Sequence, residues 1–367
     1  MNWEQVKLGD ICRPKQWKTL SKKDMAPEGF PVYGANGRIG FSKTFTHEKP
    51  VILVGCRGSC GSVHITEPKS YANGNAMALD DLDEQRVDIF FLEKYLRYRG
   101  FRDTISGTSQ PQIIRANIVE VDVQLPSLPQ QKRIAEILDV VEKLRIKRQY
   151  CLSELDALVQ STFQDMFGDP VVNEKGWQLC QISSLGEVIT GNTPSRKKPE
   201  YYGSTIEWIK SDNINNPSFL LTRADEGLSD EGKNVARVAP KGSILVTCIA
   251  GSKSCIGNAA VADRDVAFNQ QINAFVPNNK IELWYAFGLF LVGKRLIQRA
   301  STDSMKGMVS KSAFSAIEIP IPSRDLQSRF ASIVEAIERQ KARQHLHLAE
   351  IDALLASLQI RAFNGEL

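Results

Sequence analysis

Two stretches of the chain combine basic side chains with amides and hydroxyls, the residue types that contact nucleic acids. Lysine and arginine suit backbone phosphates, whereas asparagine, glutamine and arginine can hydrogen-bond to base edges in the major groove. The first stretch supplies Lys15, Gln16, Lys18 and Lys22, and the second supplies Thr193, Ser195, Arg196, Lys197, Lys210 and Asn213. Any one of these residues alone is more commonly part of a solvated surface, but two similar sets in one chain favour contact with DNA.

Each basic stretch belongs to a segment of short β-type runs separated by glycine, proline and asparagine. Residues 51–54 and 244–246 are apolar, β-branched runs, which predict short strands. A glycine-rich stretch follows each run, at residues 55–61 and 251–257. These turns carry Arg57 and Lys253, which we add to the candidate DNA contacts.

Other chemistry is poorly supported by the motifs present. Residues 216–219 are similar to the Asn-Pro-Pro-Phe motif of amino-methyltransferases, but no glycine-rich cofactor turn accompanies them. Cys56, Cys60 and His64 have no fourth ligand nearby, whereas structural zinc usually has four. No phosphate-binding Gly-x-x-x-x-Gly-Lys-[Ser/Thr] loop and no Gly-x-Ser-x-Gly elbow occur. The sequence therefore predicts no catalytic residue and no metal site.

The chain contains an internal duplication. Pro126-Ser127 and Pro322-Ser323 follow similar β-type runs, at an offset of 322 − 126 = 196. The same offset aligns Arg133 with Arg329, and residues 152–158 with residues 348–354. A period this long indicates a duplicated domain and not a solenoid repeat. The offset is smaller near the start of each copy, so the globular parts have diverged by insertion and deletion.

Each copy ends in a segment with helical periodicity after a proline. Pro129 and Pro322 precede apolar residues that recur at three- and four-residue steps. Both stripes thin out in the middle, at residues 145–149 and 341–347. Thirty-odd residues make a helix of roughly 50 Å. Two matching stripes are most simply packed on each other as a coiled coil; the alternative is that each helix packs only on its own domain.

Composition fits a two-domain cytoplasmic protein. The 367 residues suffice for two domains, and 42% are hydrophobic and 24% charged. A net charge of +4 permits nucleic-acid binding but argues for it only weakly. No apolar run reaches bilayer-spanning length, and no signal-peptide pattern opens the chain. Seven cysteines without framework spacing predict reduced thiols.

Three segments closely resemble the specificity subunit of type I restriction–modification systems: residues 106–112 (SGTSQPQ), 125–131 (LPSLPQQ) and 357–367. Residues 190–195 and 269–270 are also similar to its target-recognition domains, whereas residues 301–307 and 322–327 depart from the family pattern. The resemblance adds five residues to the candidate DNA contacts: Thr108, Gln110, Asn269, Gln270 and Lys306.

The resemblance implies an α+β fold with two duplicated mixed α/β target-recognition domains. The first is expected at residues 1–129 and the second, with its linker, at residues 168–322. Long helices are expected at residues 130–167 and 323–367, packed as an antiparallel coiled coil. Each domain would read one half of a bipartite double-stranded DNA target.

The resemblance also implies a non-catalytic chain without a cofactor of its own. The expected partners are modification (methyltransferase) subunits, two in number, and possibly restriction subunits. S-adenosylmethionine, ATP and magnesium are expected on those partners. Two alternatives stay open: a catalytic DNA-modifying enzyme with an unrecognised site, and a structural coiled-coil scaffold that never meets DNA.

Overall fold

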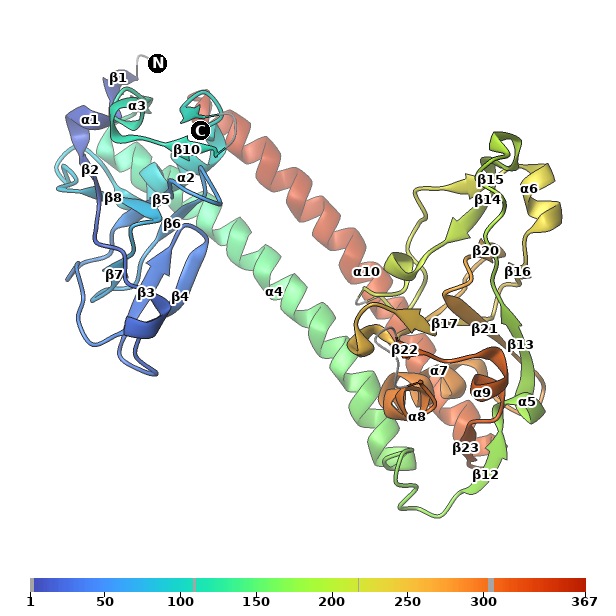
Figure 1. The fold of residues 1–367 in the computed structure, drawn as a ribbon. Helices are drawn as coiled ribbons and strands as arrows, with labels where there is room; N and C mark the ends of the chain where they lie inside the picture. The colour runs from blue at the N-terminus through green and yellow to red at the C-terminus, as the bar shows by residue number, and fades with distance from the viewer. Residues whose placement is uncertain (1–2, 108–109, 217, 303–306) are drawn as a thin grey trace. The chain divides into compact units, whose positions relative to one another are not determined.

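The computed structural model describes residues 3–107, 110–216, 218–302 and 307–367, and it forms two compact units (Figure 1). Unit 1 comprises residues 1–149 and 346–367, and unit 2 comprises residues 150–345. Both contain short strands, short helices and parts of two long helices, α4 (Leu128–Phe167) and α10 (Arg324–Phe363). The predicted α+β class is therefore confirmed.

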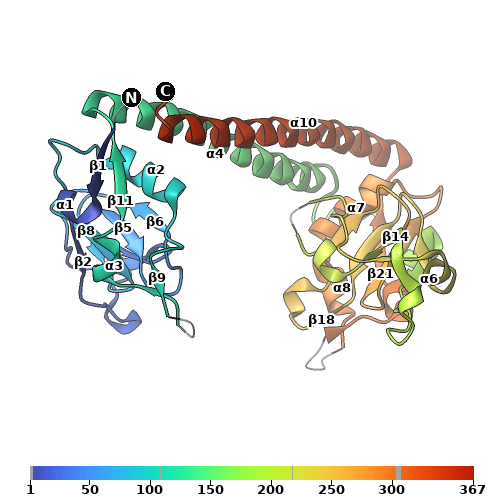
Figure 2. The same ribbon diagram turned by 90° about the horizontal axis from the view of Figure 1, so that it is seen from above.

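Unit 1 is built around a four-stranded antiparallel sheet in the order β2-β8-β5-β6. A smaller sheet, β4-β3-β7, packs against it through Tyr33 and Ala72. The strands β1 and β11 pair with each other (Figure 2). The elements of this unit that precede α4 are β1 (Glu4–Lys7), α1 (Leu8–Ile11), β2 (Arg13–Gln16), η1 (Lys22–Asp24), β3 (Phe30–Gly34), β4 (Gly37–Ser42), β5 (Ile52–Gly55), β6 (Val63–Ile65), β7 (Tyr71–Ala72), β8 (Ala76–Asp80), α2 (Ile89–Arg99), β9 (Ile105–Ser106), β10 (Gln112–Ile113), α3 (Arg115–Ile118) and β11 (Asp122–Leu125).

Unit 2 repeats the central sheet of unit 1 in the order β13-β21-β17-β19, again antiparallel. Its elements between α4 and α10 are β12 (Gln178–Gln181), α5 (Ile182–Leu185), β13 (Gly186–Thr190), η2 (Pro199–Tyr201), β14 (Tyr202–Ile209), η3 (Ser211–Asn213), β15 (Gly227–Leu228), α6 (Asp230–Val235), β16 (Val238–Ala239), β17 (Ile244–Thr247), β18 (Ile249–Ala250), η4 (Lys253–Cys255), β19 (Ala259–Val261), β20 (Val266–Phe268), β21 (Ile272–Pro277), α7 (Leu283–Val292), α8 (Lys294–Arg299), β22 (Gly307–Met308), α9 (Lys311–Ser315) and β23 (Glu318–Ile321).

The strand order confirms the internal duplication and shows where the copies diverged. The starts of β8 and β21 are related by an offset of 272 − 76 = 196, and those of β5 and β17 by the smaller offset of 244 − 52 = 192. The second sheet is different in each unit, because unit 2 has β15-β14-β20-β16 where unit 1 has β4-β3-β7. The four-stranded antiparallel sheet is therefore common to both units, and the second sheet is the part that differs between them.

The long helices are 40 residues each, about 60 Å, and within each unit their segments lie side by side and antiparallel. In unit 1, Ile134 and Leu138 of α4 share a core with Phe363 of α10, and Arg145 Nε lies 2.6 Å from Asp352 Oδ1. In unit 2, the rings of Phe163 and Phe330 meet edge to face. Coiled-coil geometry along the pair stays a prediction. Among the described residues, no helix carries an apolar stretch able to cross a membrane.

The globular part of unit 2 rests on both helix segments. The buried helix α7 brings Gly288 so close to α4 and α10 that an added Cβ would lie 2.8 Å from Phe163 and 2.9 Å from Phe330. Beside this contact, the buried ammonium of Lys341 lies 2.7 Å from Asp156 and 3.7 Å from the centre of the Phe219 ring. The ion pair joins α10 to α4, and the ring contact joins both to the globular part.

A buried glutamine in the first turn of each long helix fastens it to its globular part. Gln131 Nε2 donates to the carbonyls of Arg86 and Pro126 at 2.8 and 2.9 Å, and its Oε1 accepts from Asp88 N at 2.8 Å. Gln327 repeats the device at the offset of the duplication. Its Nε2 donates to Pro322 O at 3.0 Å, and its Oε1 accepts from Glu282 N at 2.9 Å. Both side chains are fully enclosed.

We expect Gln131→Leu and Gln327→Leu each to lower the free energy of unfolding by about 2–4 kcal/mol. Leucine fills a similar volume but leaves buried backbone groups without partners, at about 1–3 kcal/mol for each such group. Urea unfolding of the full chain is the measurement. Gln149→Leu, at an exposed position of α4, is the matched control and should stay within about 0.5 kcal/mol of the parent. Equal effects at buried and exposed positions would contradict the role of these glutamines.

Candidate nucleic-acid interface

Three loops of unit 2 converge at one edge of its sheets. β14 and β20 run parallel, with Trp208 opposite Ala267, so the residues that follow them lie together. The loop after β13, residues 190–198, joins them through backbone hydrogen bonds. Gly191 N donates to Ile272 O at 3.1 Å, and Asn192 N donates to Phe268 O at 3.0 Å. The predicted segments 193–197, 210–213 and 269–270 are therefore brought together.

Gly191 makes this convergence possible. A Cβ at this position would lie 2.1 Å from Asn269 O and 2.4 Å from Phe268 O, distances that no side chain tolerates. The loop therefore passes directly over the backbone that follows β20. Two residues further on, the Thr193 hydroxyl donates a hydrogen bond to the side-chain carbonyl of Gln270. Thr193 and Gln270 are both exposed, so a hydroxyl and an amide stand together on the surface.

The structure gives two of the predicted residues a structural role instead of an exposed one. Asn213 is 8% exposed; its Oδ1 accepts from Lys210 N at 2.9 Å and its Nδ2 donates to Arg223 O at 2.9 Å. Asn269 is likewise 8% exposed, and both ends of its amide bond to Gln271. Because these amides are committed within their turns, we no longer include them among the candidate base contacts.

Arg196 and Lys210 meet at a carboxylate that the sequence did not single out. Arg196 Nη1 and Nη2 donate to the two oxygens of Glu226 at 3.2 and 2.7 Å, and Lys210 Nζ lies 2.8 Å from Glu226 Oε2. Hydrogen bonds from Arg196 and then Lys210 lower the pKa of Glu226 to about 2. Arg196 and Glu226 lie far apart in the sequence, so no local pattern could have revealed their pairing.

The guanidinium of Arg196 also lies on an aromatic surface. Its Cζ is 4.4 Å from the ring centre of Tyr202 and 5.2 Å from that of Trp208. Both rings are fixed by hydrogen bonds to the loop that carries Arg196: Tyr202 Oη donates to Pro194 O at 2.7 Å, and Trp208 Nε1 donates to Asn192 O at 3.3 Å. Ser195 and Lys197, on either side of Arg196, are exposed.

A fourth loop starts beside the same edge. The carbonyl oxygen of Gln271 accepts from both Cys248 N and Ile249 N, at 2.8 and 3.0 Å. The chain then runs through β18 to η4, which begins with exposed Lys253. The predicted residue Lys253 is thus exposed and lies beside α8, where its carbonyl oxygen accepts from Gln298 Nε2 at 3.3 Å. Lys306 lies outside the described residues.

Unit 1 repeats this arrangement with different side chains. The carbonyl of Asn75 accepts from Cys56 N and Arg57 N at 3.0 and 3.3 Å. Arg57 is exposed and pairs by a backbone bridge with Gln112, close to exposed Gln110. The Gln16 amide donates to Cys56 Sγ at 2.9 Å and to Gly74 O at 3.2 Å, which ties β2 to the same loops. Thr108 lies outside the described residues.

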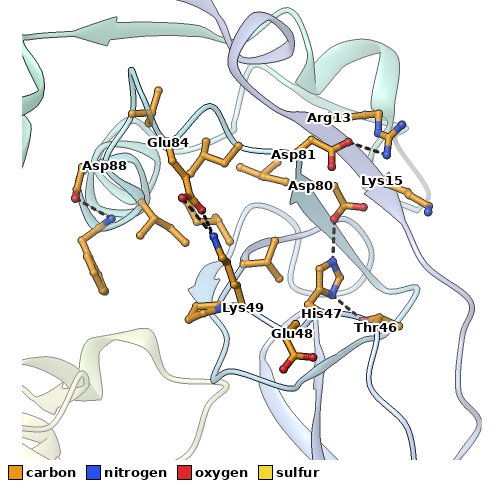
Figure 3. Close-up of a pocket in the computed structure, with 18 of the residues that line it drawn as sticks. Arg13, Lys15, Thr46, His47, Glu48, Lys49, Asp80, Asp81, Glu84 and Asp88 are labelled. Atoms are coloured by element: carbon orange, nitrogen blue, oxygen red, sulfur yellow. Dashed lines mark hydrogen bonds and ion pairs between the residues drawn. The ribbon is translucent and has the colours of Figure 1, made fainter.

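Of the predicted lysines in unit 1, Lys15 borders a groove of about 780 Å³, which lies toward the other end of the central sheet, where Arg13 of β2 pairs with Asp80 of β8 (Figure 3). Lys15 Nζ lies 3.7 Å above the centre of the Trp17 ring, whose Nε1 donates to Asp80 Oδ2 at 3.2 Å. Lys18 and Lys22 are exposed and lie in the segment that follows Trp17, with Lys22 in η1. Lys15 is thus held in place, whereas Lys18 and Lys22 extend from the surface.

A hydrogen-bonded chain of Thr46, His47 and Asp80 lies in this groove. His47 Nε2 is 2.9 Å from Asp80 Oδ1, and His47 Nδ1 is 2.7 Å from Thr46 Oγ1 (Figure 3). The order of groups is that of a nucleophile, base and acid. However, Thr46 Oγ1 also accepts from Ala72 N at 2.9 Å, which ties it to the end of β7. The chain therefore fixes Asp80, and through it Trp17 and Lys15.

Comparisons with known proteins are consistent across sequence and structure. The sequence matches the family described as Type I restriction modification DNA specificity domain over residues 1–150 and 174–351. It is 29% identical over 198 residues to the Type I restriction enzyme HindI specificity subunit of Haemophilus influenzae, which covers 53% of this chain and 42% of that protein. It is 28% identical over 181 residues to the MjaIX specificity subunit of Methanocaldococcus jannaschii, covering 47% of this chain and 41% of that one.

The matches to these two relatives thus span less than half of their lengths. A solved structure gives the wider likeness in fold. The type I restriction–modification S subunit from M. genitalium superposes with a TM-score of 0.62 at 17% sequence identity, covering 99% of this chain and 96% of that one.

We expect Gly191→Ala to displace the loop at residues 190–198. Because a Cβ cannot fit against Asn269 O, the amides of residues 191 and 192 should lose their hydrogen bonds and exchange with solvent at least about tenfold faster, which corresponds to about 1.4 kcal/mol. Hydrogen exchange measured by mass spectrometry tests this. Gly251→Ala is the matched control, since a Cβ there meets nothing within 4 Å. Unchanged protection in Gly191→Ala would contradict the close approach.

Proposed function

Because the chain belongs to the Type I restriction modification DNA specificity family, we propose that its two units each read one half of a bipartite double-stranded DNA target. The observation that carries this proposal is the repeated convergence of loops. In each unit, one carbonyl, that of Asn75 or Gln271, gathers two loops at the same edge of a duplicated sheet. Exposed cations and amides are then presented from equivalent places.

The two units differ in the chemistry that they present. Unit 1 presents Arg57 and Gln110 together with Lys15, Lys18 and Lys22, whereas unit 2 presents Thr193 with Gln270 and the group Arg196, Lys210 and Glu226. The two units thus place hydrogen-bond donors and acceptors differently around the same central sheet. Such surfaces suit different base sequences, because base edges differ in their pattern of donors and acceptors. Lys197, Lys18 and Lys22 are exposed and suit phosphates, which fix the position of the protein on DNA.

We also propose that the helices dock the modification subunits, two in number, and that restriction subunits join through the complex. Support comes from large apolar side chains that α4 and α10 leave exposed in unit 1. Val140 is 65% exposed, Leu144 41%, Leu354 49% and Ile360 50%. Exposed apolar residues on a helix surface are typical of sites where another chain binds. S-adenosylmethionine, ATP and magnesium would then act on the partner subunits.

In this proposal the protein itself is non-catalytic. The hydrogen bonds that link Thr46, His47 and Asp80 serve only to fix the side chains that line the groove. Purified protein mixed with DNA, S-adenosylmethionine, ATP and magnesium should therefore give neither methyl transfer nor cleavage. Methylation should appear when modification subunits are added, and at saturating DNA its rate per assembled complex in His47→Ala should equal that of the parent. Radiolabelled methyl incorporation and gel analysis of the DNA are the measurements. Methylation or cutting by the chain alone would make it an enzyme and overturn this part.

Independent reading by the two units predicts the outcome of a domain exchange. Replacing residues 1–126 by the equivalent region of a relative should change one half of the methylated motif and leave the other half as it was. Mapping of methylated sites in cells carrying the chimaera and its modification subunits measures both halves at once. The reciprocal exchange of residues 178–321 is the matched control and should change only the other half. A chimaera in which both halves change would show that the units do not read separately.

A further inference from the structure

Building on the function proposed above, we infer that Glu226 is a positioning residue that holds Arg196 ready to read a guanine in the half-site of unit 2. The geometry carries the inference. Arginine has five N–H donors in a rigid fork. Glu226 takes two of them in a bidentate pair, and among the described residues the other three have no partner.

The position of Glu226 is itself fixed by the backbone. Glu226 directly precedes β15, and its carbonyl oxygen accepts from Trp208 N at 3.0 Å. This bond places the carboxylate beside the start of the loop after β14, where Lys210 Nζ reaches it from a second direction at 2.8 Å. A carboxylate fixed by strand pairing and held by two cations gives Arg196 a single defined partner.

Two aromatic rings beneath Arg196 further restrict the conformation of its side chain. Tyr202 and Trp208 lie under the guanidinium, and each is hydrogen-bonded to a carbonyl of the loop that carries Arg196. Even so, the side chain of Arg196 is 54% exposed, against 36% for that of Glu226. The guanidinium is therefore both immobilised and open to a ligand.

These features favour a base over a phosphate as the ligand. A phosphate contact gains from free positive charge and tolerates a mobile side chain, as at exposed Lys197 next to Arg196. Glu226 instead neutralises one of the two cations that it holds, which weakens attraction to phosphate. Fixed direction is what base reading requires, and the free edge of an arginine fork matches the O6 and N7 acceptors of guanine.

The experiment uses the full chain assembled with its modification subunits. Methylated-site mapping first defines the parent target, and a competition assay then varies each base pair of that target in turn. Glu226→Gln should lower the preference for guanine at one position of the unit 2 half-site by about tenfold or more. Preferences at all other positions should stay as in the parent. Because a negative charge is removed, affinity for DNA without the target should be higher, an increase that loss of a structural contact would not give.

Two further variants separate the possible outcomes. Arg196→Lys keeps the carboxylate but loses the fork, so it should lose preference at the same position as Glu226→Gln. If Glu226→Gln does not fold, Arg196→Lys still tests the inference. A preference for guanine that is retained in Arg196→Lys would overturn it. Lys197→Ala should weaken binding equally at all positions and lower the slope of log affinity against log salt by about one.

The experiments distinguish a failure of the inference from a failure of the proposed function. If Lys197→Ala lowers affinity and the domain exchange alters one half-site, but Glu226→Gln leaves every base preference unchanged, unit 2 reads DNA without this device and only the inference is wrong. Equal weakening at all positions in Glu226→Gln would likewise overturn it. If none of the three variants changes affinity or motif, this surface does not face DNA and the proposed function of unit 2 is wrong as well.

Discussion

One backbone carbonyl in each unit determines how the surface loops are arranged. The oxygens of Asn75 and Gln271 each accept two N–H groups from successive residues that follow a central strand. A carbonyl has two lone pairs, so this double acceptance satisfies it fully and leaves both donors paired. The bond needs no particular side chain at either partner. Side chains around it are therefore free to differ, and in the two units they do.

The duplication and the long helices could be predicted from the sequence. Helical periodicity is a local pattern and the offset between the two copies is a repeated one, so both can be recognised in a single sequence. Arg196, Lys197 and Lys253 could be named as candidates because basic residues in glycine-rich or polar loops are conspicuous. The residues that act through distant partners were not found. Glu226 is remote in sequence from Arg196, as Asp80 is from His47, so only folding brings each pair together.

Asparagine was the residue type that misled the sequence interpretation. Asn213 and Asn269 have side chains that suit base edges, yet both serve turns whose backbone donors need an acceptor nearby. Asparagine commonly makes such bonds in turns, because its amide reaches the backbone two or three residues away. The exposed Gln270 beside Asn269 has the longer side chain and reaches Thr193 in the neighbouring loop instead. Composition alone does not distinguish these two uses of an amide.

The depressed pKa of Glu226 has a consequence for the conditions under which unit 2 can work. A carboxyl group normally has a pKa near 4.5, and Arg196 and Lys210 bring that of Glu226 to about 2. The stabilisation from this ion pair is therefore fully present above about pH 4.5 and is lost progressively as the pH falls from there through about 2. Acidification of a cell would alter many histidine-dependent interactions long before it reached this group. The orientation of Arg196 is accordingly insensitive to protons above about pH 4.5.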